Sequence, residues 1–143
     1  MLQRVARASV RVGDELVGEI GPGLCVLVGV AHDDGAQEAA KLAGKVARLR
    51  VFERDGRFDV SLLDIGGEAL VVSQFTLLGD TTRKKGTRPD FSQAAPREQA
   101  EPLYEAFCSA LGALGVPVAT GVFGARMALE LVNDGPVTIV LEL

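Results

Sequence analysis

The segment Ser73-Gln74-Phe75-Thr76 places two hydroxyl side chains and an amide directly after an apolar run at 69–72. Such a run predicts a buried strand, so the polar residues would lie where the strand ends. A strand end can present backbone N–H groups and small hydroxyls to a cleft, and preorganised N–H groups stabilise the oxyanion of acyl transfer. Alternatively, Ser73 and Thr76 only close the strand by hydrogen bonding to the backbone. The residue types leave both interpretations open.

A second unusual segment, Asn133-Asp134-Gly135-Pro136-Val137-Thr138, lies between two apolar stretches where a plain Asn-Gly or Asp-Gly pair would suffice for a hairpin. Proline after glycine adds a residue with fixed φ and no N–H, and it permits a cis peptide bond. On propensity alone the segment predicts a turn.

The chain has few of the side chains on which common catalytic devices depend. It contains one histidine, His32, so any Ser/His/Asp or Cys/His arrangement would have to use that residue. His32 lies in turn-like sequence, where solvent-exposed histidines are common. The two cysteines, Cys25 and Cys108, have no neighbouring cysteine or histidine at a metal-ligand spacing. We therefore expect buried thiols, no disulfide framework and no zinc site.

The overall charge excludes one class of function. Fifteen Lys and Arg against 19 Asp and Glu give a net charge of −4, too acidic for a global polycation that wraps nucleic acid. The segment 79–89 departs from this balance, since it carries Arg83, Lys84, Lys85 and Arg88 without apolar periodicity. It predicts a loop whose charges either contact RNA phosphates or are simply solvated. No apolar stretch approaches the roughly 20 residues of a membrane span and no secretory signal is visible, so a cytoplasmic location is expected.

Hydrophobic periodicity predicts the strands and helices that carry these residues. Strands are expected at 4–12, 16–20, 24–31, 49–53, 58–63, 68–75, 116–122, 128–132 and 137–143, the first with its even-numbered residues on one face. One helix is expected over 36–48, capped by Asp33 or Asp34, and another from Pro96 through Leu114. The length suits one core, and no linker or repeat is visible. We therefore expect a single α+β domain over 1–143, with a mixed, mostly antiparallel sheet or half-barrel and two main helices.

Several segments together resemble the D-aminoacyl-tRNA deacylase family. They are Gln3-Arg4-Val5 with Ala8-Ser9-Val10, Asp64 to Gly67 running into Leu70 to Leu77, Arg88-Pro89 with Phe91, Thr120-Gly121 with Phe123, and Asn133 to Thr138. They occur in the family's order and span nearly the whole chain, which makes the resemblance specific. It implies hydrolysis of the ester that joins a D-amino acid to the 3′-terminal adenosine of tRNA. It also implies a homodimer with active sites at the subunit interface and no metal or organic cofactor.

The resemblance assigns the catalytic centre to Ser73, Gln74, Phe75 and Thr76. The backbone N–H groups of Phe75 and Thr76 are expected to hold the oxyanion, while the terminal ribose 2′-hydroxyl helps to activate water. Covalent catalysis by Thr76 is the alternative, although no general base is identifiable near it in the sequence.

The resemblance assigns chiral selection to Gly135-Pro136 in the cis form, inserted into the partner's active site so that an L side chain is rejected sterically. A steric filter cannot exclude an amino acid without a side chain, so glycyl-tRNA is expected as a second substrate. Arg4 is expected to brace the Gly135 and Pro136 carbonyls with its planar guanidinium, and Asn133 and Thr138 to support the segment. By residue type alone, Arg4 would be a strand-surface arginine.

Two further sites would meet the RNA of the substrate. Phe123 is expected to stack on the terminal adenine, although an aromatic residue in a strand is more often part of the core, and the basic segment 79–89 is expected to contact acceptor-stem phosphates. Two rival functions are a non-catalytic RNA-binding or protein-interaction module and a cofactor-free hydrolase of small esters or D-peptides. An aromatic content of 5%, with no Trp, disfavours a single-strand RNA module.

Overall fold

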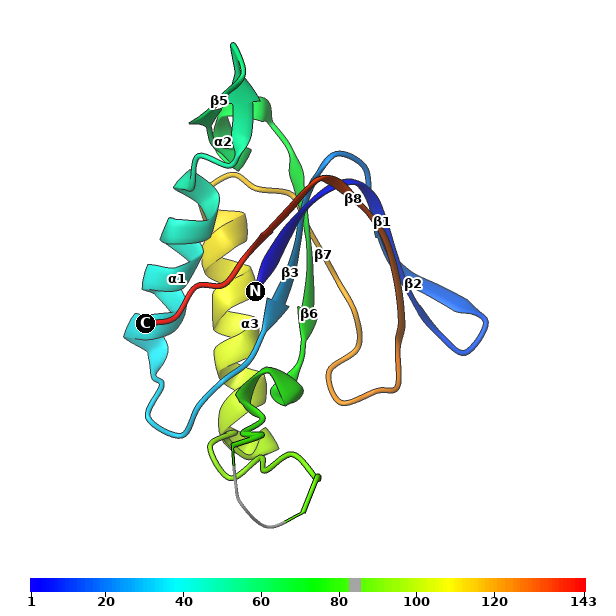
Figure 1. Cartoon of the computed structure of the whole chain (residues 1–143), viewed down its shortest axis with the longest axis vertical. Helices are drawn as coiled ribbons and strands as arrows, with labels where there is room; N and C mark the ends of the chain where they lie inside the picture. Colours follow the sequence, from blue (N-terminus) through cyan, green and yellow to red (C-terminus); the bar gives the residue numbers. More distant parts are fainter. Residues whose placement is uncertain (83–85) are drawn as a thin grey trace.

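The computed structural model describes residues 1–82 and 86–143, and in them a curled six-stranded sheet carries two long helices on one face (Figure 1). The sheet strands are β1 (Leu2–Val12), β2 (Glu15–Ile20), β3 (Gly23–Val28), β6 (Glu68–Ser73), β7 (Val118–Thr120) and β8 (Ala128–Ile139). The helices are α1 (Ala36–Arg48), α2 (Leu62–Ile65) and α3 (Arg97–Ala113), with a 3-10 turn, η1 (Phe75–Leu78). The strands β4 (Phe52–Arg54) and β5 (Arg57–Val60) form a separate hairpin after α1.

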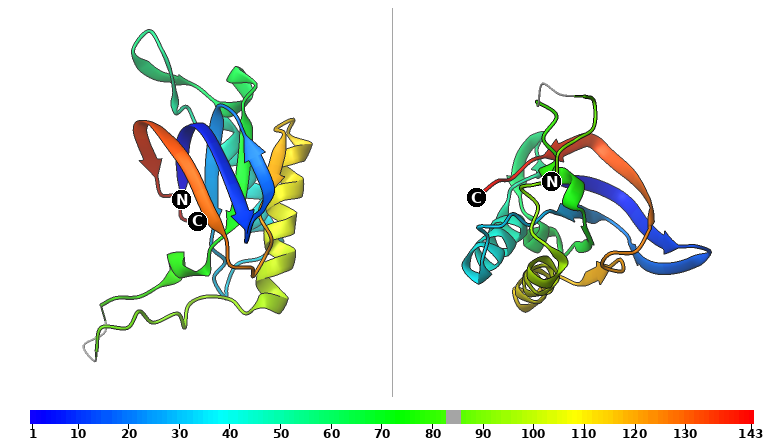
Figure 2. Two further views of the ribbon diagram at one scale, coloured as in Figure 1. Left: turned by 90° about the vertical axis from the view of Figure 1, so that its right-hand side faces the viewer. Right: turned by 90° about the horizontal axis from the view of Figure 1, so that it is seen from below.

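Strand β1 organises the sheet because it pairs with three other strands. Strand β8 runs antiparallel along one edge of β1, from Ile139 opposite Leu2 to Ala128 opposite Arg11. The other edge is shared between β3, opposite the first half of β1, and β2, opposite the second half. Strands β6 and β7 then follow β3 in parallel. The predicted α+β fold with a mixed sheet is confirmed, and the sheet curls towards a barrel (Figures 1 and 2).

Two apolar clusters lie on the two faces of the sheet. In β3, Leu24, Val26 and Val28 pack on the face covered by α1 and α3, whereas Cys25 and Leu27 line the inside of the curl. All six residues of β3 are buried, as its uninterrupted apolar sequence predicts for a strand covered on both faces.

The two long helices are confirmed, but their surroundings differ from the prediction in detail. Gly35, not an aspartate, is the N-cap of α1, and its N–H donates to the Glu38 carboxylate at 2.9 Å. The strand predicted at 58–63 is shorter, because the Ser61 hydroxyl accepts from the Asp64 N–H and caps the short helix α2.

The prediction of two strands at 128–132 and 137–143 is wrong. The single strand β8 pairs with β1 in one direction throughout, with Asn133 opposite Val5 and Thr138 opposite Gln3. Between these pairs β8 advances five residues while β1 advances two, so three extra residues bulge out and the chain does not reverse. We call Asn133–Thr138 the β8 bulge. The strand ends at Ile139.

Strand β1 also departs from the simple alternation that was predicted. Leu2 belongs to the helix-side cluster, whereas Val5, Ala8 and Val10 line the inside of the curl. The change of face coincides with the irregular pairing of β1 and β8 around Val5. No helix in the two described ranges is long and apolar enough to cross a membrane.

Candidate functional site

The predicted catalytic segment lies where β6 ends, beside the end of the parallel strand β3. Ser73 is opposite Val28, and the next N–H, that of Gln74, donates to the Val28 carbonyl at 2.8 Å. Phe75 then begins η1, and Gly79 closes this turn by donating its N–H to the Thr76 carbonyl at 3.1 Å. The first N–H groups of a helix have no acceptor within that helix. The start of η1 therefore supplies the kind of donor that an oxyanion requires.

This segment carries the hydroxyls of Ser73 and Thr76, and the structure joins the Thr76 hydroxyl to an amide and not to a base. The Gln74 amide donates to Thr76 Oγ1 at 2.9 Å, and an amide does not take up the hydroxyl proton. His32 contacts the Ser92 carbonyl through Nε2 at 3.0 Å. Across residues 1–82 and 86–143, no carboxylate or imidazole is hydrogen-bonded to Thr76. The arrangement can polarise an acyl group but does not form a Ser/His/Asp type of device.

Phe75 is the most exposed apolar side chain of the segment. Phe75 is 59% exposed, and its ring packs edge-on against Phe91 with 5.1 Å between the ring centroids. The two rings connect η1 to the chain that follows the basic segment 79–89.

The peptide bond between Gly135 and Pro136 is cis, as the resemblance implies. Gly135 has a φ of +136°, which L side chains rarely adopt. A Cβ at this position would lie 2.8 Å from Val137 Cγ2 and 3.0 Å from Arg4 Nη2. Both the backbone conformation and the space therefore require glycine. Gly135 and Pro136 are exposed.

Asn133 and Thr138 are joined across the β8 bulge. Asn133 Oδ1 accepts from the Val137 N–H at 2.8 Å, and Asn133 Nδ2 donates to Thr138 Oγ1 at 2.9 Å. Gln3 Nε2 donates to the same hydroxyl at 3.4 Å. Side chains therefore replace the backbone hydrogen bonds that are missing where the two strands separate.

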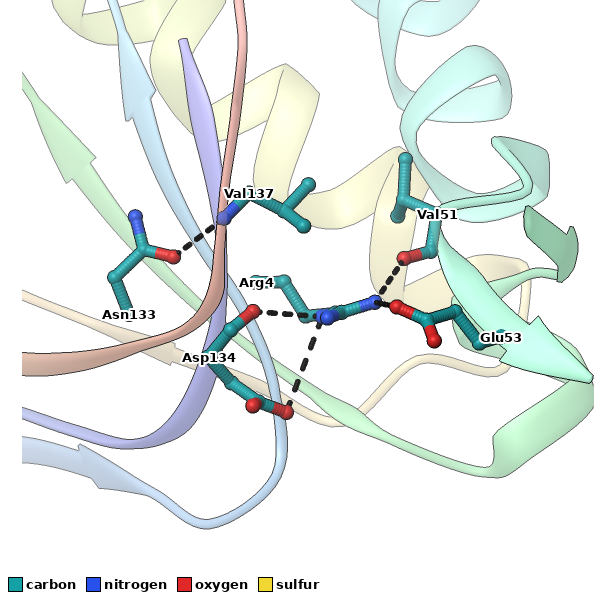
Figure 3. A network of polar contacts seen from close by, with 6 residues as sticks. All are labelled: Arg4, Val51, Glu53, Asn133, Asp134 and Val137. Carbon is teal, nitrogen blue, oxygen red and sulfur yellow. Dashed lines mark hydrogen bonds and ion pairs between the residues drawn. The ribbon is translucent and has the colours of Figure 1, made fainter. Parts of the chain in front are cut away.

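Arg4 holds the bulge from its other side (Figure 3). Its guanidinium donates from Nε to the Asp134 carbonyl at 2.8 Å. From Nη1 it donates to the Val51 carbonyl at 3.0 Å and to Glu53 Oε1 at 3.2 Å. The Phe58 ring lies 5.9 Å from the guanidinium carbon. Arg4 is only 7% exposed, so the expectation of a strand-surface arginine is wrong.

Within one chain, the Arg4 guanidinium is hydrogen-bonded to the carbonyl of Asp134, one residue before the Gly135-Pro136 pair. Its bracing of the Gly135 and Pro136 carbonyls stays a prediction. Sequence reasoning also missed Val51 and Glu53, which are 47 and 49 residues away from Arg4 in the chain. No motif marks either residue, because a main-chain carbonyl and a half-exposed glutamate have no sequence signature.

The β8 bulge and η1 lie at opposite ends of the sheet (Figure 1). Asn133 is opposite Val5, Val5 is opposite Gly23, and Gly23 is opposite Glu68, where β6 begins. Ser73 is at the other end of β6, five residues on, which corresponds to about 17 Å of strand. One copy of the chain therefore does not bring the two motifs into one site.

Phe123 follows β7 at the same end of the sheet as Ser73, since Thr120 is opposite Val71 near the end of β6. Its ring is half-buried, with its centroid 5.7 Å from that of Tyr104 and 5.5 Å from the Arg97 guanidinium. The Phe123 ring thus packs partly against the core.

The basic segment is described only in part. Arg83, Lys84 and Lys85 lie outside the described residues, and Arg88 is exposed. The segment is closed at its base by two backbone hydrogen bonds between Asp80 and Asp90, at 2.7 and 2.8 Å.

The cysteines have no ligand-like arrangement. Cys25 is fully buried, and burial raises its pKa to about 11. Cys108 is half-buried, and burial raises its pKa as well. In the part of the chain that the structure describes, no three His, Cys, Asp or Glu side chains are grouped so that they could hold a metal ion.

Comparison with known proteins places these features in a family. The family model described as D-Tyr-tRNA(Tyr) deacylase matches residues 1–142. The D-aminoacyl-tRNA deacylase of Chloroflexus aurantiacus is 56% identical over 143 residues, which cover 99% of this chain and 88% of that protein. The D-aminoacyl-tRNA deacylase of a Roseiflexus species is 59% identical over 99% of this chain and 91% of its own length.

Two solved structures share the fold of this chain. The c-Myc DNA Unwinding Element Binding Protein superimposes with a TM-score of 0.90 at 44% identity, over 99% of this chain and 96% of that one. A probable eukaryotic D-amino acid tRNA deacylase shares the fold with a TM-score of 0.76 at 20% identity, over 94% and 93% of the two chains. The family match over residues 1–142, together with relatives of 56% and 59% identity over nearly the whole chain, shows that this protein belongs to the D-Tyr-tRNA(Tyr) deacylase family.

Proposed function

We propose that this protein hydrolyses the ester bond of D-aminoacyl-tRNA in the cytoplasm. The observation that carries the proposal is the identity of 56% and 59%, over 99% of this chain, to proteins named D-aminoacyl-tRNA deacylase. In the reaction, water attacks the ester carbonyl carbon and the bond between this carbon and the ribose oxygen breaks. The ribose oxygen takes a proton from the water, and free amino acid and tRNA leave. An aminoacyl ester is already activated, so orientation and oxyanion stabilisation supply much of the barrier reduction.

The start of η1 is the proposed oxyanion site. The N–H groups of Phe75 and Thr76 are the first two of this turn, and helix starts provide N–H donors that intrahelical bonding does not use. One preorganised donor of this kind is worth about 3 kcal/mol. Ser73 and Gln74 shape the pocket beside these donors, and the ribose 2′-hydroxyl of the substrate assists the attacking water.

Thr76 acts through its backbone and not as a nucleophile. Its hydroxyl accepts from Gln74 and has no basic partner among the described residues, whereas a threonine nucleophile needs a base or an N-terminal amine.

The Gly135-Pro136 pair of a second copy completes the site and selects the D-enantiomer. Within one chain, about 17 Å along the strands separates the β8 bulge from η1. A neighbouring subunit therefore supplies this segment. In the homodimer, the Gly135 and Pro136 carbonyls accept from the substrate ammonium and occupy the direction that an L side chain would take. Glycyl-tRNA has no side chain to exclude and is therefore the second substrate.

The RNA of the substrate extends from this site. Phe123, at the same end of the sheet as η1, offers the exposed part of its ring to the terminal adenine, and Arg83, Lys84, Lys85 and Arg88 contact acceptor-stem phosphates.

Release of tyrosine from D-tyrosyl-tRNA, with L-tyrosyl-tRNA as control, tests the proposal. We expect rapid hydrolysis of the D-ester and of glycyl-tRNA, and none of the L-ester above the spontaneous rate. Hydrolysis of D-tyrosine methyl ester at the same rate would indicate a small-ester hydrolase instead. Resistance of glycyl-tRNA, while several D-aminoacyl-tRNAs are cleaved, would contradict the steric account of chirality.

A further inference from the structure

We infer that the β4–β5 hairpin positions the Gly135-Pro136 pair, and that Glu53 is a positioning residue that acts through Arg4. The inference deepens the proposed function, because its effect on catalysis depends on the role proposed for Gly135-Pro136. The structural part, that Glu53 orders the β8 bulge, stands on contacts within one chain.

The Arg4 guanidinium joins three separate parts of the chain. Its acceptors are the Val51 carbonyl just before the hairpin, Glu53 within β4, and the Asp134 carbonyl in the β8 bulge. A guanidinium is a rigid planar fork, so fixing two of its acceptors determines where the third must lie. Figure 3 shows the guanidinium between the hairpin and the bulge.

Arg4 needs these contacts because its guanidinium is buried. The side chain is 8% exposed, and a buried charge is costly unless it is paired and hydrogen-bonded. Glu53 provides the nearer carboxylate, 3.2 Å from Nη1, while the Asp134 carboxylate lies 3.9 Å from Nε. Without Glu53, the guanidinium loses its nearest counter-charge and an acceptor on the hairpin side.

Arg4 contacts the β8 bulge at Asp134, the residue directly before Gly135. The Asp134 carbonyl belongs to the peptide that enters Gly135, and the Arg4 Nη2 atom occupies space beside Gly135. On the opposite side, the Val137 N–H is held by Asn133. The bulge is therefore clamped between its own side chains and a guanidinium that the hairpin holds in place.

Glu53→Ala removes the hairpin's charged contact with Arg4, and the same hairpin offers a matched control. Asp59 is also a half-exposed carboxylate, but it pairs with Arg50 at 3.8 Å and Arg54 at 3.6 Å and not with Arg4. Asp59→Ala thus removes a charge and two ion pairs without touching the clamp. Glu53→Gln retains an oxygen acceptor for Arg4 Nη1.

Amide hydrogen exchange at Val137 reports the order of the bulge without reference to activity. In Glu53→Ala we expect this amide to exchange about tenfold faster. Local opening of the bulge then breaks fewer Arg4 contacts and costs less free energy. In Asp59→Ala it should exchange as in the wild type, and Glu53→Gln should recover most of the protection. Equal Val137 exchange in Glu53→Ala, Asp59→Ala and the wild type would overturn the inference.

Steady-state hydrolysis of D-tyrosyl-tRNA then separates this inference from the proposed function. We expect Glu53→Ala to lower kcat by about tenfold with little change in KM, because the misplaced pair affects the reacting ester more than RNA binding. Asp59→Ala should be unaffected. Faster Val137 exchange with unchanged kcat would confirm that Glu53 orders the bulge and would contradict the role proposed for Gly135-Pro136.

Discussion

At the level of single residues, the proposed site depends on main-chain N–H donors and not on a reactive side chain. Thr76 is the clearest example, because its hydroxyl accepts a hydrogen bond from the Gln74 amide. We predict that Thr76→Ala retains turnover within about tenfold of the wild type, since the backbone N–H groups at 75 and 76 remain. Thr76→Pro removes one of these N–H groups and should lower kcat by about 100-fold or more. A trapped acyl-enzyme in the wild type, together with a loss of several orders of magnitude in Thr76→Ala, would contradict this account.

Gly135 is a position at which glycine is required by geometry. Its φ of +136° and the close approach of Val137 and Arg4 both oppose a Cβ. We predict that Gly135→Ala costs about 1–3 kcal/mol in urea unfolding and abolishes hydrolysis of D-tyrosyl-tRNA. Gly13→Ala is the control, because Gly13 also has a positive φ, of +58°, but a Cβ added there would meet no atom within 4 Å. Equal activity in the two variants would show that the Gly135 backbone is not part of the site.

The family resemblance, not the residue types, predicts a supporting role for Asn133 and Thr138, and the structure joins their side chains. The partners of Arg4 could not be predicted, because Val51 contributes a main-chain carbonyl and Glu53 reaches Arg4 only through the folding of the hairpin.

At the level of helices and strands, the sequence predicts the elements that local interactions determine. The helix α1 and the buried strand β3 follow from periodicity and from an uninterrupted apolar run. The short helix α2 was missed although Ser61 and Asp64 carry the spacing of a capping box. Strand β8 was divided in two because Gly135-Pro136 has turn propensity, and only its pairing with β1 on both sides keeps it a single strand.

The basic segment 79–89 carries a prediction about RNA binding. Changing Arg83, Lys84 and Lys85 to Ala should reduce the slope of log K against log salt concentration for tRNA binding by about 2, since fewer counterions are released. The matched control changes Lys41, Lys45 and Arg48 on α1 to Ala, which alters the net charge of the protein equally. An unchanged slope in the first variant, or the same change in both, would mean that the segment does not contact phosphates.

At the scale of the whole molecule, stability should depend on the ionisation of a core thiol. Burial raises the pKa of Cys25 to about 11 from an ordinary value of 9.0, so the folded protein keeps a proton that the unfolded chain loses between these values. The free energy of unfolding should therefore fall from about pH 9 to about pH 11, by about 1–3 kcal/mol for this group.

Urea unfolding at about pH 8 and about pH 10.5 checks this expectation. Cys25→Ala should show a smaller fall than the wild type, because alanine has no proton to lose, whereas the raised pKa of Tyr104 persists in both proteins. Equal falls would show that Cys25 does not contribute to the alkaline loss of stability.

We propose that each active site needs two copies of the chain. The β8 bulge and η1 are at opposite ends of one sheet, so each copy can offer its bulge to another copy while receiving that copy's bulge at its own η1. A closed two-fold dimer satisfies both requirements at once.

Mixing two inactive variants tests whether the active site is shared between two copies. Gly135→Ala retains an intact η1, and Thr76→Pro retains an intact bulge, so each heterodimer holds one complete site. Random assortment of equal amounts, verified by native mass spectrometry, should recover about a quarter of the wild-type activity on D-tyrosyl-tRNA. Heterodimers that form but remain as inactive as either parent would contradict the account.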